Sequence, residues 1–247
     1  IPYFLVFGAG HKADESTPTL LYGYGGFEIS LTPRYMASVG KLWLERGGAF
    51  AMANIRGGGE FGPKWHAAAK KENRQRAFDD FIAVAEDLIK TKVTTSAQLG
   101  IMGGSNGGLL VGATVTQRPE LFNAVVCQVP LLDMIRYTKL LAGASWAAEY
   151  GDPEDPEMRK VIEKYSPYQN VKKDTEYPKA FIMTSTKDDR VHPGHARKMV
   201  ARLMEYGHPV YYYENTEGGH AAAANLKQRA RRYALEYVYL SQELGLK

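Results

Sequence analysis

Length, composition and charge place this chain among ordinary globular proteins. It has 247 residues, of which 45% are hydrophobic and 23% charged, and this usage excludes disordered, collagenous and coiled-coil chains. The net charge of +4 is too small and too scattered to indicate a nucleic-acid-binding protein. The single cysteine, Cys127, excludes an internal disulfide and a multi-cysteine metal site. The length favours one domain over residues 1–247 rather than two small ones.

Short apolar runs, each followed by a turn signal, alternate with helical patterns along the chain. The predicted strands are, in order, Pro2–Phe7, Thr19–Gly23, Ala49–Asn54, Gln98–Met102, Ala124–Val129, Ala180–Thr186 and Pro209–Glu214. Apolar residues with helical spacing mark residues 78–89, 196–203 and 230–244. Continuous apolar strands alternating with amphipathic helices are typical of a mostly parallel sheet covered on both faces. The sequence therefore predicts a single α/β domain, with an irregular surface excursion at the proline-rich segment 151–170.

One uncharged stretch is long enough to cross a bilayer. Val93–Gln117 lacks charged residues, but its hydroxyl side chains and glycines fit a strand, a tight turn and a helix better than a membrane span. The chain begins at Ile1 without an initiator methionine or a signal sequence, so we expect a piece of a longer protein. The sequence does not specify a compartment; we expect a soluble protein that contacts no membrane, cytoplasmic or periplasmic if its source is bacterial.

The strongest functional motif follows the predicted strand Gln98–Met102. Gly103, Ser105 and Gly107 form the pattern G-x-S-x-G directly before a predicted helix, which is the nucleophile elbow of α/β-hydrolases. The glycines permit a turn so sharp that the serine hydroxyl is exposed. The first amides of the following helix supply hydrogen-bond donors where an oxyanion would develop. We therefore predict that Ser105 is a nucleophile.

A nucleophilic serine needs a base and an orienting acid, which in this fold follow it in the order serine, acid, histidine. Among the six histidines, His220 follows the last predicted strand, Pro209–Glu214, at the sheet edge where ligands bind. The acid should come from the loop after the preceding strand, which contains Asp188 and Asp189. Adjacent residues point in opposite directions, so the residues alone leave both aspartates open.

Two alternative sites are disfavoured. A metal site could combine the two aspartates with His192 and His195, but Pro193–Gly194 interrupts the helix that H-x-x-H spacing requires. The segment Arg56–Gly62 contains G-x-G-x-x-G, the dinucleotide fingerprint, but the acidic residue expected about 20 positions later falls inside a predicted helix. A tight turn is the favoured interpretation there. We expect neither a metal nor a cofactor.

Two further segments could belong to the site. The loop Tyr22–Phe27 follows the second predicted strand, where these hydrolases supply the second oxyanion donor. Either the Tyr24 hydroxyl or a backbone amide near Gly25 could serve, and a structural glycine turn is equally compatible with the sequence. Trp146 and Tyr150 lie four residues apart and would share one face of a helix. Such a pair belongs to a core more often than to a pocket.

Together these segments resemble the peptidase domain of the prolyl oligopeptidase family. The matching motifs run through nearly the whole chain in family order; they are Leu21–Phe27, Ala53–Glu60, Gly103–Gly108, Asp188–Val191 and Gly218–His220. The resemblance implies an α/β-hydrolase fold, with a mostly parallel central sheet and helices on both faces. It also implies a serine endopeptidase that cuts short peptides on the carboxyl side of proline through a covalent acyl-enzyme.

The resemblance assigns roles to individual residues. Ser105 would be the nucleophile, His220 the general base, and Asp188, rather than Asp189, the orienting acid. This mechanism requires no metal and no cofactor. A proline ring is rigid, apolar and without an N–H, so a flat aromatic slot can select it by shape without leaving a donor unpaired.

The same resemblance completes the oxyanion site and the pocket. Tyr24 would donate its hydroxyl to the oxyanion beside the backbone amide of Asn106. Trp146 would stack on the substrate proline, and Arg190 would hold a substrate carbonyl. The pocket positions implied by the family are Phe27, Asn106, Leu131, Trp146, Tyr150, Arg190 and Val191.

Two features depart from the family pattern. Family members carry a β-propeller over the active site, and residues 1–247 encode neither a propeller nor the first strand of the family's peptidase domain. We therefore expect a propeller segment in the parent protein. In addition, alanine follows His220 at positions 221 and 222, where the family commonly has glycine.

Two other functions are compatible with the sequence. A broader carboxylesterase or acyl-peptide hydrolase would use the same triad on small esters or acylated peptides. A non-catalytic binding module would keep the hydrolase scaffold without the chemistry. A preference for proline-ending over alanine-ending chromogenic peptides distinguishes the first alternative, and covalent labelling of Ser105 by a fluorophosphonate probe eliminates the second.

Overall fold

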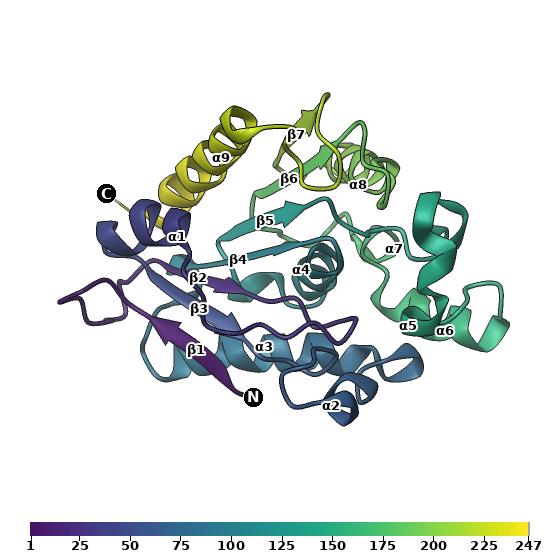
Figure 1. Cartoon of the computed structure of the whole chain (residues 1–247), viewed down its shortest axis with the longest axis horizontal. Helices are drawn as coiled ribbons and strands as arrows, with labels where there is room; N and C mark the ends of the chain where they lie inside the picture. Colours follow the sequence, from purple (N-terminus) through teal and green to yellow (C-terminus); the bar gives the residue numbers. More distant parts are fainter. Residues whose placement is uncertain (247) are drawn as a thin grey trace.

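A seven-stranded sheet forms the centre of the molecule (Figure 1). The structure, a computed structural model, describes residues 1–246. The strands are β1 (Tyr3–Val6), β2 (Thr19–Tyr22), β3 (Ala49–Ala53), β4 (Leu99–Gly104), β5 (Ala124–Gln128), β6 (Ala180–Ser185) and β7 (Val210–Asn215). Their order is β1-β3-β2-β4-β5-β6-β7, in which β1 runs antiparallel to β3 and the other neighbours pair in parallel. The predicted strands and the mostly parallel sheet are confirmed.

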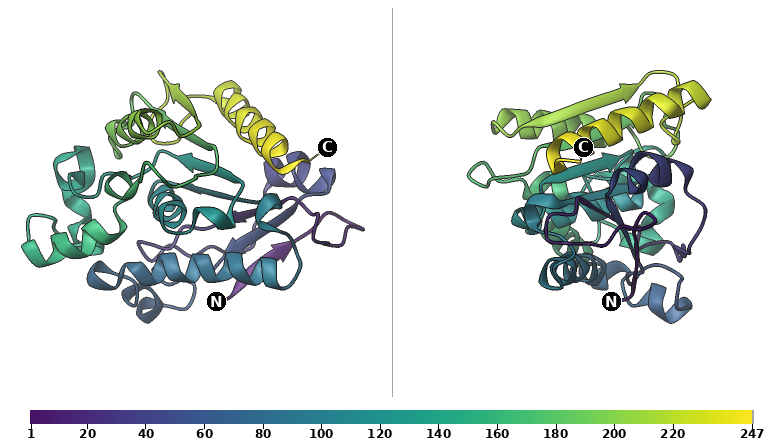
Figure 2. Two further views of the ribbon diagram at one scale, coloured as in Figure 1. Left: turned by 180° about the vertical axis from the view of Figure 1, so that it is seen from behind. Right: turned by 90° about the vertical axis from the view of Figure 1, so that its left-hand side faces the viewer.

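Helices cover both faces of this sheet (Figures 1 and 2). They are α1 (Ala37–Leu42), α2 (Pro63–Ala67), α3 (Gln75–Lys90), α4 (Asn106–Gln117), α5 (Ala147–Tyr150), α6 (Pro156–Tyr165), α7 (Pro167–Asn170), α8 (Gly194–Glu205) and α9 (Leu226–Leu244). Side chains of a strand point alternately to the two sides, which gives two cores. Val125 and Cys127 of β5 join the core with α3, α4 and α8, whereas Ala124 and Val126 join the core with α1 and α9.

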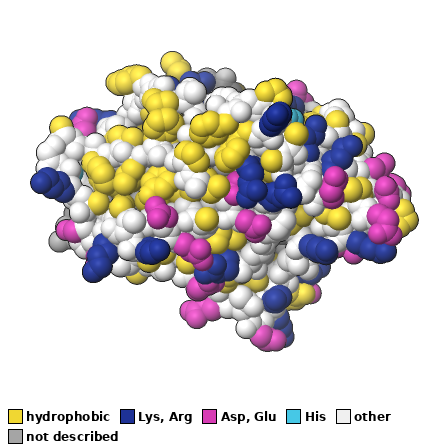
Figure 3. All heavy atoms as spheres, turned by 90° about the horizontal axis from the view of Figure 1, so that it is seen from below, with side chains coloured by type: hydrophobic (Ala, Val, Ile, Leu, Met, Phe, Trp, Pro, Cys, Tyr) yellow, Lys and Arg dark blue, Asp and Glu magenta, His cyan; other side chains and the backbone are white. Residues whose placement is uncertain are grey.

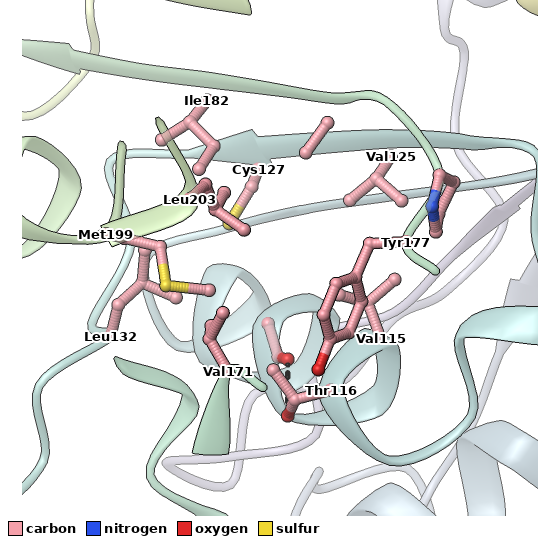
Figure 4. Close-up of a pocket in the computed structure, with 13 residues that line it drawn as sticks. Val115, Thr116, Val125, Cys127, Leu132, Val171, Tyr177, Ile182, Met199 and Leu203 are labelled. Carbon is pink, nitrogen blue, oxygen red and sulfur yellow. Dashed lines mark hydrogen bonds between the residues drawn. The ribbon is translucent and has the colours of Figure 1, made fainter. Parts of the chain in front are cut away.

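An apolar cavity of about 20 Å³ remains in the core between α4, β5, β6 and α8 (Figure 4). Cys127 lies in its wall, with its Sγ 3.4 Å from the Gly108 carbonyl oxygen. Burial raises the pKa of the Cys127 thiol, which therefore stays protonated. The cavity is too small for a substrate and no charged residue lines it, so we interpret it as imperfect packing.

The segment between Gly151 and Asn170, which we predicted to be irregular, instead contains α6 and α7. The prediction was wrong because its prolines were taken as helix breakers. Pro156 and Pro167 occupy the first positions of these helices, where a missing N–H costs no hydrogen bond. Asp155 caps α6 by accepting the Glu157 N–H at 2.9 Å. Helices α5 to α7 gather beyond one end of the sheet in Figure 1.

Among residues 1–246, no helix has both the length and the apolar character that crossing a bilayer requires. The uncharged stretch Val93–Gln117 supplies β4, the turn after it and α4, as predicted. On the face drawn in Figure 3, charged side chains of both signs are interspersed, and hydrophobic side chains gather toward one end.

A buried histidine of α8 holds the loop that follows β5. His195 is 1% exposed, and its Nδ1 accepts the backbone N–H groups of Leu132 at 3.2 Å and Asp133 at 3.0 Å. Burial lowers the pKa of His195 to about 4, which keeps the ring neutral and Nδ1 available as an acceptor. The ring therefore fixes the backbone on the carboxyl side of Leu131.

Replacing His195 with glutamine should make the protein less sensitive to acid. Between its ordinary pKa near 6.5 and its folded pKa near 4, the unfolded chain binds a proton that the folded chain does not, so stability falls as the pH drops through this window. We expect the wild-type protein to lose on the order of 2–3 kcal/mol more than the variant in urea unfolding between about pH 7 and pH 4. His11→Gln, at an exposed histidine, serves as the control. Equal losses in the wild type and His195→Gln would contradict this assignment.

Candidate active site

The loops after five strands converge at the carboxyl edge of the sheet, which is where ligands bind in open α/β proteins. Tyr24 follows β2, Ser105 follows β4, Leu131 follows β5, Asp188 follows β6 and His220 follows β7. These strands are neighbours in the sheet, so residues far apart in sequence are brought to one edge.

The turn at Ser105 has the backbone conformation of a nucleophile elbow. Ser105 adopts φ +58° and ψ −117°, a left-handed conformation that non-glycine residues rarely occupy. Its N–H donates to the Gln128 carbonyl at 2.9 Å, and its own carbonyl accepts the N–H groups of Gly108 and Leu109. These hydrogen bonds hold the strained residue in place at the start of α4.

The glycines of the elbow are required by close backbone contacts. A Cβ at Gly103 would collide with the Gly107 carbonyl, and one at Gly107 would press on the Gly23 carbonyl. The next residue, Gly108, packs against Pro130 in the loop after β5. The G-x-S-x-G pattern thus reflects three backbone segments that meet without intervening side chains.

Asp188, rather than Asp189, faces the histidine. The His220 Nδ1 lies 2.8 Å from Oδ2 and 3.0 Å from Oδ1 of Asp188, whose side chain is fully buried. The Asp188 Oδ1 also accepts the N–H groups of Arg190 at 3.0 Å and Val191 at 2.9 Å. These bonds orient the carboxylate, whereas Asp189 is exposed. Of the two aspartates that the residues alone left open, Asp188 is thus the one in contact with His220.

His220 belongs to the segment Gly218–Ala222, which we call the histidine loop. Within residues 1–246, no hydrogen bond joins its ring to the Ser105 hydroxyl, so proton transfer between them would require the ring or the hydroxyl to move. Such bonds commonly tighten only when substrate binds. Ala222 of this loop is buried and adopts φ +54°, a left-handed conformation that favours glycine. The alanine noted in the sequence is thus accommodated with backbone strain.

Two hydrogen-bond donors lie where an oxyanion would form. The Tyr24 phenol faces the Ser105 hydroxyl, and burial raises the pKa of Tyr24, so the phenol stays protonated and can donate. The backbone N–H of Asn106 is the first of α4, a helix position without an intrahelical acceptor. This geometry favours the hydroxyl of Tyr24 over an amide near Gly25.

A cavity of about 290 Å³ opens beside Ser105. Phe27 and Tyr150 form its aromatic wall, with their rings edge to face at a centroid distance of 5.6 Å. Its lining residues are Tyr24, Phe27, Ile29, Ser105, Leu131, Ser145, Trp146, Tyr150 and Arg190. It shares no residue with the apolar cavity of Figure 4.

Two predicted pocket residues lie behind this cavity rather than in its wall. Val191 is 2% exposed and joins the hydrophobic core, and the Asn106 side chain is fully buried. Conversely, Ile29 and Ser145 line the cavity, and the sequence analysis did not identify them. Neither residue belongs to a motif or a periodic pattern that could have marked it.

The Asn106 side chain connects the elbow to the pocket. Its Oδ1 accepts the Arg74 Nη2 at 2.6 Å and the Tyr150 hydroxyl at 2.7 Å. Its Nδ2 donates to the Tyr24 carbonyl at 2.6 Å. Arg74 is fully buried, with its guanidinium 5.2 Å from the centre of the Tyr150 ring. One amide thus fixes both the aromatic wall and the loop that carries the oxyanion donor.

Glu149 completes this buried network. Its Oε1 accepts the Phe27 N–H at 2.9 Å and the Arg74 Nη1 at 3.2 Å, and its Oε2 lies 2.8 Å from His66 Nε2. A buried carboxylate costs free energy unless it is paired, and here it has two cationic or polar partners and a backbone amide. The buried position of Arg74 could not be recognised from the sequence, because this residue lies in a charged run that resembles a solvated surface.

The side chains considered for a metal site are engaged elsewhere. His192 Nδ1 accepts the Gly194 N–H at 2.9 Å, His195 holds the loop after β5, and Asp188 faces His220. Among residues 1–246, no three His, Cys, Asp or Glu side chains are grouped so that they could hold a metal ion.

The glycine-rich segment Arg56–Gly62 forms a tight turn beside the loop of Tyr24. Gly57 has φ +95° and lies so close to the Gly25 carbonyl that a Cβ would not fit. Asp80 of α3, one of the two aspartates about 20 positions after this fingerprint, instead accepts the Arg56 Nε at 2.8 Å. The segment therefore supports the loop that carries Tyr24.

Comparisons with known proteins agree with this geometry. A peptidase of Sinorhizobium fredii is 63% identical over 244 residues, 99% of this chain and 34% of the relative. The prolyl endopeptidase of Elizabethkingia meningoseptica is 43% identical over 251 residues, all of this chain and 36% of the relative. The solved structure of a post-proline cleaving enzyme from Rickettsia typhi superimposes with a TM-score of 0.97 at 46% identity, over the whole chain and 36% of that structure.

The chain therefore spans about a third of the length of the relatives it matches. The α/β-hydrolase fold and the family resemblance predicted from the sequence are confirmed. The model of the prolyl oligopeptidase family matches residues 34–247, and the chain belongs to this family.

Proposed function

We propose that this chain is the peptidase domain of a serine endopeptidase that cleaves short peptides after proline. The observation that carries the proposal is the oriented Asp188–His220 pair at the same sheet edge as the Ser105 elbow and its aromatic cavity. The names of the similar proteins from Elizabethkingia meningoseptica and Rickettsia typhi support a post-proline specificity.

In this mechanism Ser105 attacks the carbonyl carbon that follows the proline ring. A C–O bond forms, the hydroxyl proton passes to His220 Nε2, and Asp188 stabilises the resulting imidazolium through Nδ1. The Tyr24 hydroxyl and the Asn106 N–H donate to the oxyanion. The C–N bond then breaks as His220 returns the proton to the leaving amine, and water hydrolyses the acyl-enzyme with His220 again as base.

The cavity suits a proline ring. Trp146 is half-buried and supplies a flat face, and the Phe27 and Tyr150 rings line the same cavity. Arg190 is exposed at the cavity and could donate to a carbonyl of the preceding residue. The apolar ring faces of Trp146, Phe27 and Tyr150 match a substrate ring that has no hydrogen-bonding group to offer.

We further propose that the parent protein carries a β-propeller over this site, which would restrict substrates to short peptides. The length of the relatives, about three times that of this chain, supports additional segments. The broader esterase remains the second candidate, because the cavity beside Ser105 would also admit a small ester.

The proposed specificity predicts a strong preference for proline. We expect kcat/KM for a chromogenic peptide ending in proline to exceed that of its alanine counterpart by about 100-fold, because the alanine side chain leaves the aromatic slot unfilled. A fluorophosphonate probe should label the wild type and not Ser105→Ala. Equal rates for the two peptides, or a short acyl ester hydrolysed faster than either, would favour the esterase.

The adjacent aspartates provide a matched pair of variants. Asp188→Asn should lower kcat about 10⁴-fold, because the amide no longer stabilises the imidazolium and favours the wrong tautomer of His220. Asp189→Asn should retain kcat within about twofold, since its side chain is exposed and does not face the ring. Steady-state kinetics on the proline peptide test both variants. A reversed order would refute the assignment of the acid.

Trp146→Ala should reduce the preference for the proline peptide over the alanine peptide. Loss of the stacking face should lower kcat/KM for the proline peptide by about 10- to 100-fold and change the alanine peptide much less. Tyr35→Ala, at a side chain 94% exposed, is the control for loss of an aromatic residue. Unchanged selectivity in Trp146→Ala would show that the ring does not contact the substrate proline.

A further inference from the structure

A buried glutamate lies behind the site, on the opposite side of the sheet from the aromatic cavity. Glu236 of α9 is 1% exposed, in a helix that packs on β4 and β5. Its Oε1 accepts the side-chain Nε2 of Gln128 at 2.5 Å and lies 3.3 Å from Nε of Arg232. Neither the triad nor the pocket accounts for this carboxylate.

One partner of Glu236 contacts the turn at Ser105, and the other contacts the histidine loop. The backbone carbonyl of Gln128 accepts the N–H of Ser105 at 2.9 Å, so this residue is bonded to both the elbow and the glutamate. The Arg232 Nη1 donates at 2.7 Å to the carbonyl of Ala221, the residue after His220. One carboxylate therefore links the turn that carries the nucleophile to the loop that carries the base.

We propose that Glu236 is a positioning residue that couples the nucleophile elbow to the histidine loop, and that its ionised form holds the loop through Arg232. The proposal rests on the serine peptidase mechanism described above. The link matters because the ring of His220 is not hydrogen-bonded to Ser105 and must be brought within reach of it. A looser loop would place the ring correctly for a smaller fraction of the time.

The surroundings of Glu236 make its charge responsive to pH. Burial raises the pKa of Glu236 to about 7, opposed by the nearby Arg232 and the hydrogen bond from Gln128. The guanidinium itself is mostly buried, with 17% of the side chain exposed, and lies 4.8 Å from the centre of the Tyr233 ring. Above this pKa the pair is ionic, and below it a neutral acid faces the arginine.

The other elements around Glu236 add little charge. Strands β4 and β5 carry no charged residue, and the Cys127 thiol points to the opposite core. From α9 itself, Tyr237 is a neighbouring phenol whose own pKa is raised. Lys41 of α1 pairs with Glu45, and Glu217 beside the histidine loop is bonded to Gln228. Arg232 is therefore the charged group that faces Glu236 most directly.

The experiment measures phosphonylation of Ser105 by a fluorophosphonate probe across the pH range. In this step an O–P bond forms, the P–F bond breaks, fluoride leaves, and the hydroxyl proton passes to His220. The rate of this reaction depends on removal of the Ser105 hydroxyl proton by His220 and does not depend on proline binding. If the wild type is not labelled at any pH, the proposed serine peptidase function itself is rejected. Labelling of the wild type without the pH-dependent difference described below rejects only the coupling.

Glu236→Gln preserves the acceptor for Gln128 but cannot ionise. We expect the wild type to react about tenfold faster than this variant at about pH 8.5, and at nearly the same rate at about pH 5.5. The two proteins are compared at the same pH, so the ratio of their rates isolates the contribution of Glu236. Glu243→Gln, in the same helix but paired with Lys179, should match the wild type at every pH.

Arg232→Met provides the second test. If Glu236 acts through Arg232, this variant should show the same pH-dependent deficit, and adding Glu236→Gln to it should slow labelling no further. This comparison also decides the matter if the single glutamine variant folds poorly. A ratio that does not change with pH, or additive losses in the double variant, would overturn the proposal.

Stability separates positioning from a structural role. Because the folded pKa of Glu236 lies above its ordinary value, its ionisation destabilises the folded state as the pH rises through about 4.5 to 7. Glu236→Gln should therefore melt no lower than the wild type at about pH 8.5, although it reacts more slowly. A lower melting temperature at that pH together with a pH-independent loss of rate would identify a merely structural residue.

Discussion

The close approach of backbone segments at Ser105 is the constraint on which the rest of the site depends. The residue is held at φ +58° by its hydrogen bonds to the strand end at Gln128 and to the first turn of α4. Glycines at 103 and 107 allow this contact, since any side chain there would separate the segments. The strained turn presents the hydroxyl and the first amide of α4 to the same point in space. The other groups of the proposed site must be positioned relative to that point.

Buried charged residues secure this arrangement from two sides. Arg74 and Glu149 fix the pocket and the Tyr24 loop through Asn106, on the side of α3. Arg232 and Glu236 connect the elbow and the histidine loop, on the side of α9. Such networks add little net stability, because desolvation offsets the attraction between the charges. These networks instead fix the positions of the Tyr24 loop, the Ser105 turn and the histidine loop.

The strands could be predicted from the sequence more completely than the residues of the site and their supporting contacts. Strands were recognisable because β2 to β6 are buried on both faces and hence continuously apolar. The residues proposed as the triad could be named because the elbow motif and strand order restrict the candidates; the choice of Asp188 needed the resemblance or the hydrogen bonds. The helices that begin at Pro156 and Pro167 were not predicted, because the sequence does not distinguish a proline that begins a helix from one that ends it. Arg74, Glu149 and Glu236 could not be found, because a charged residue in a helical pattern is usually on the surface and only tertiary packing shows otherwise.

The complete burial of α4 has a consequence for how the site moves. All its residues from Asn106 to Thr116 are buried, so its central amides can exchange hydrogen with solvent only when the whole domain unfolds. The segment around His220 is partly exposed, carries backbone strain at Ala222 and needs only a local opening. The proposed nucleophile and its proposed base thus belong to regions that differ in burial and in backbone strain. We therefore expect the histidine loop to open more readily than the turn at Ser105.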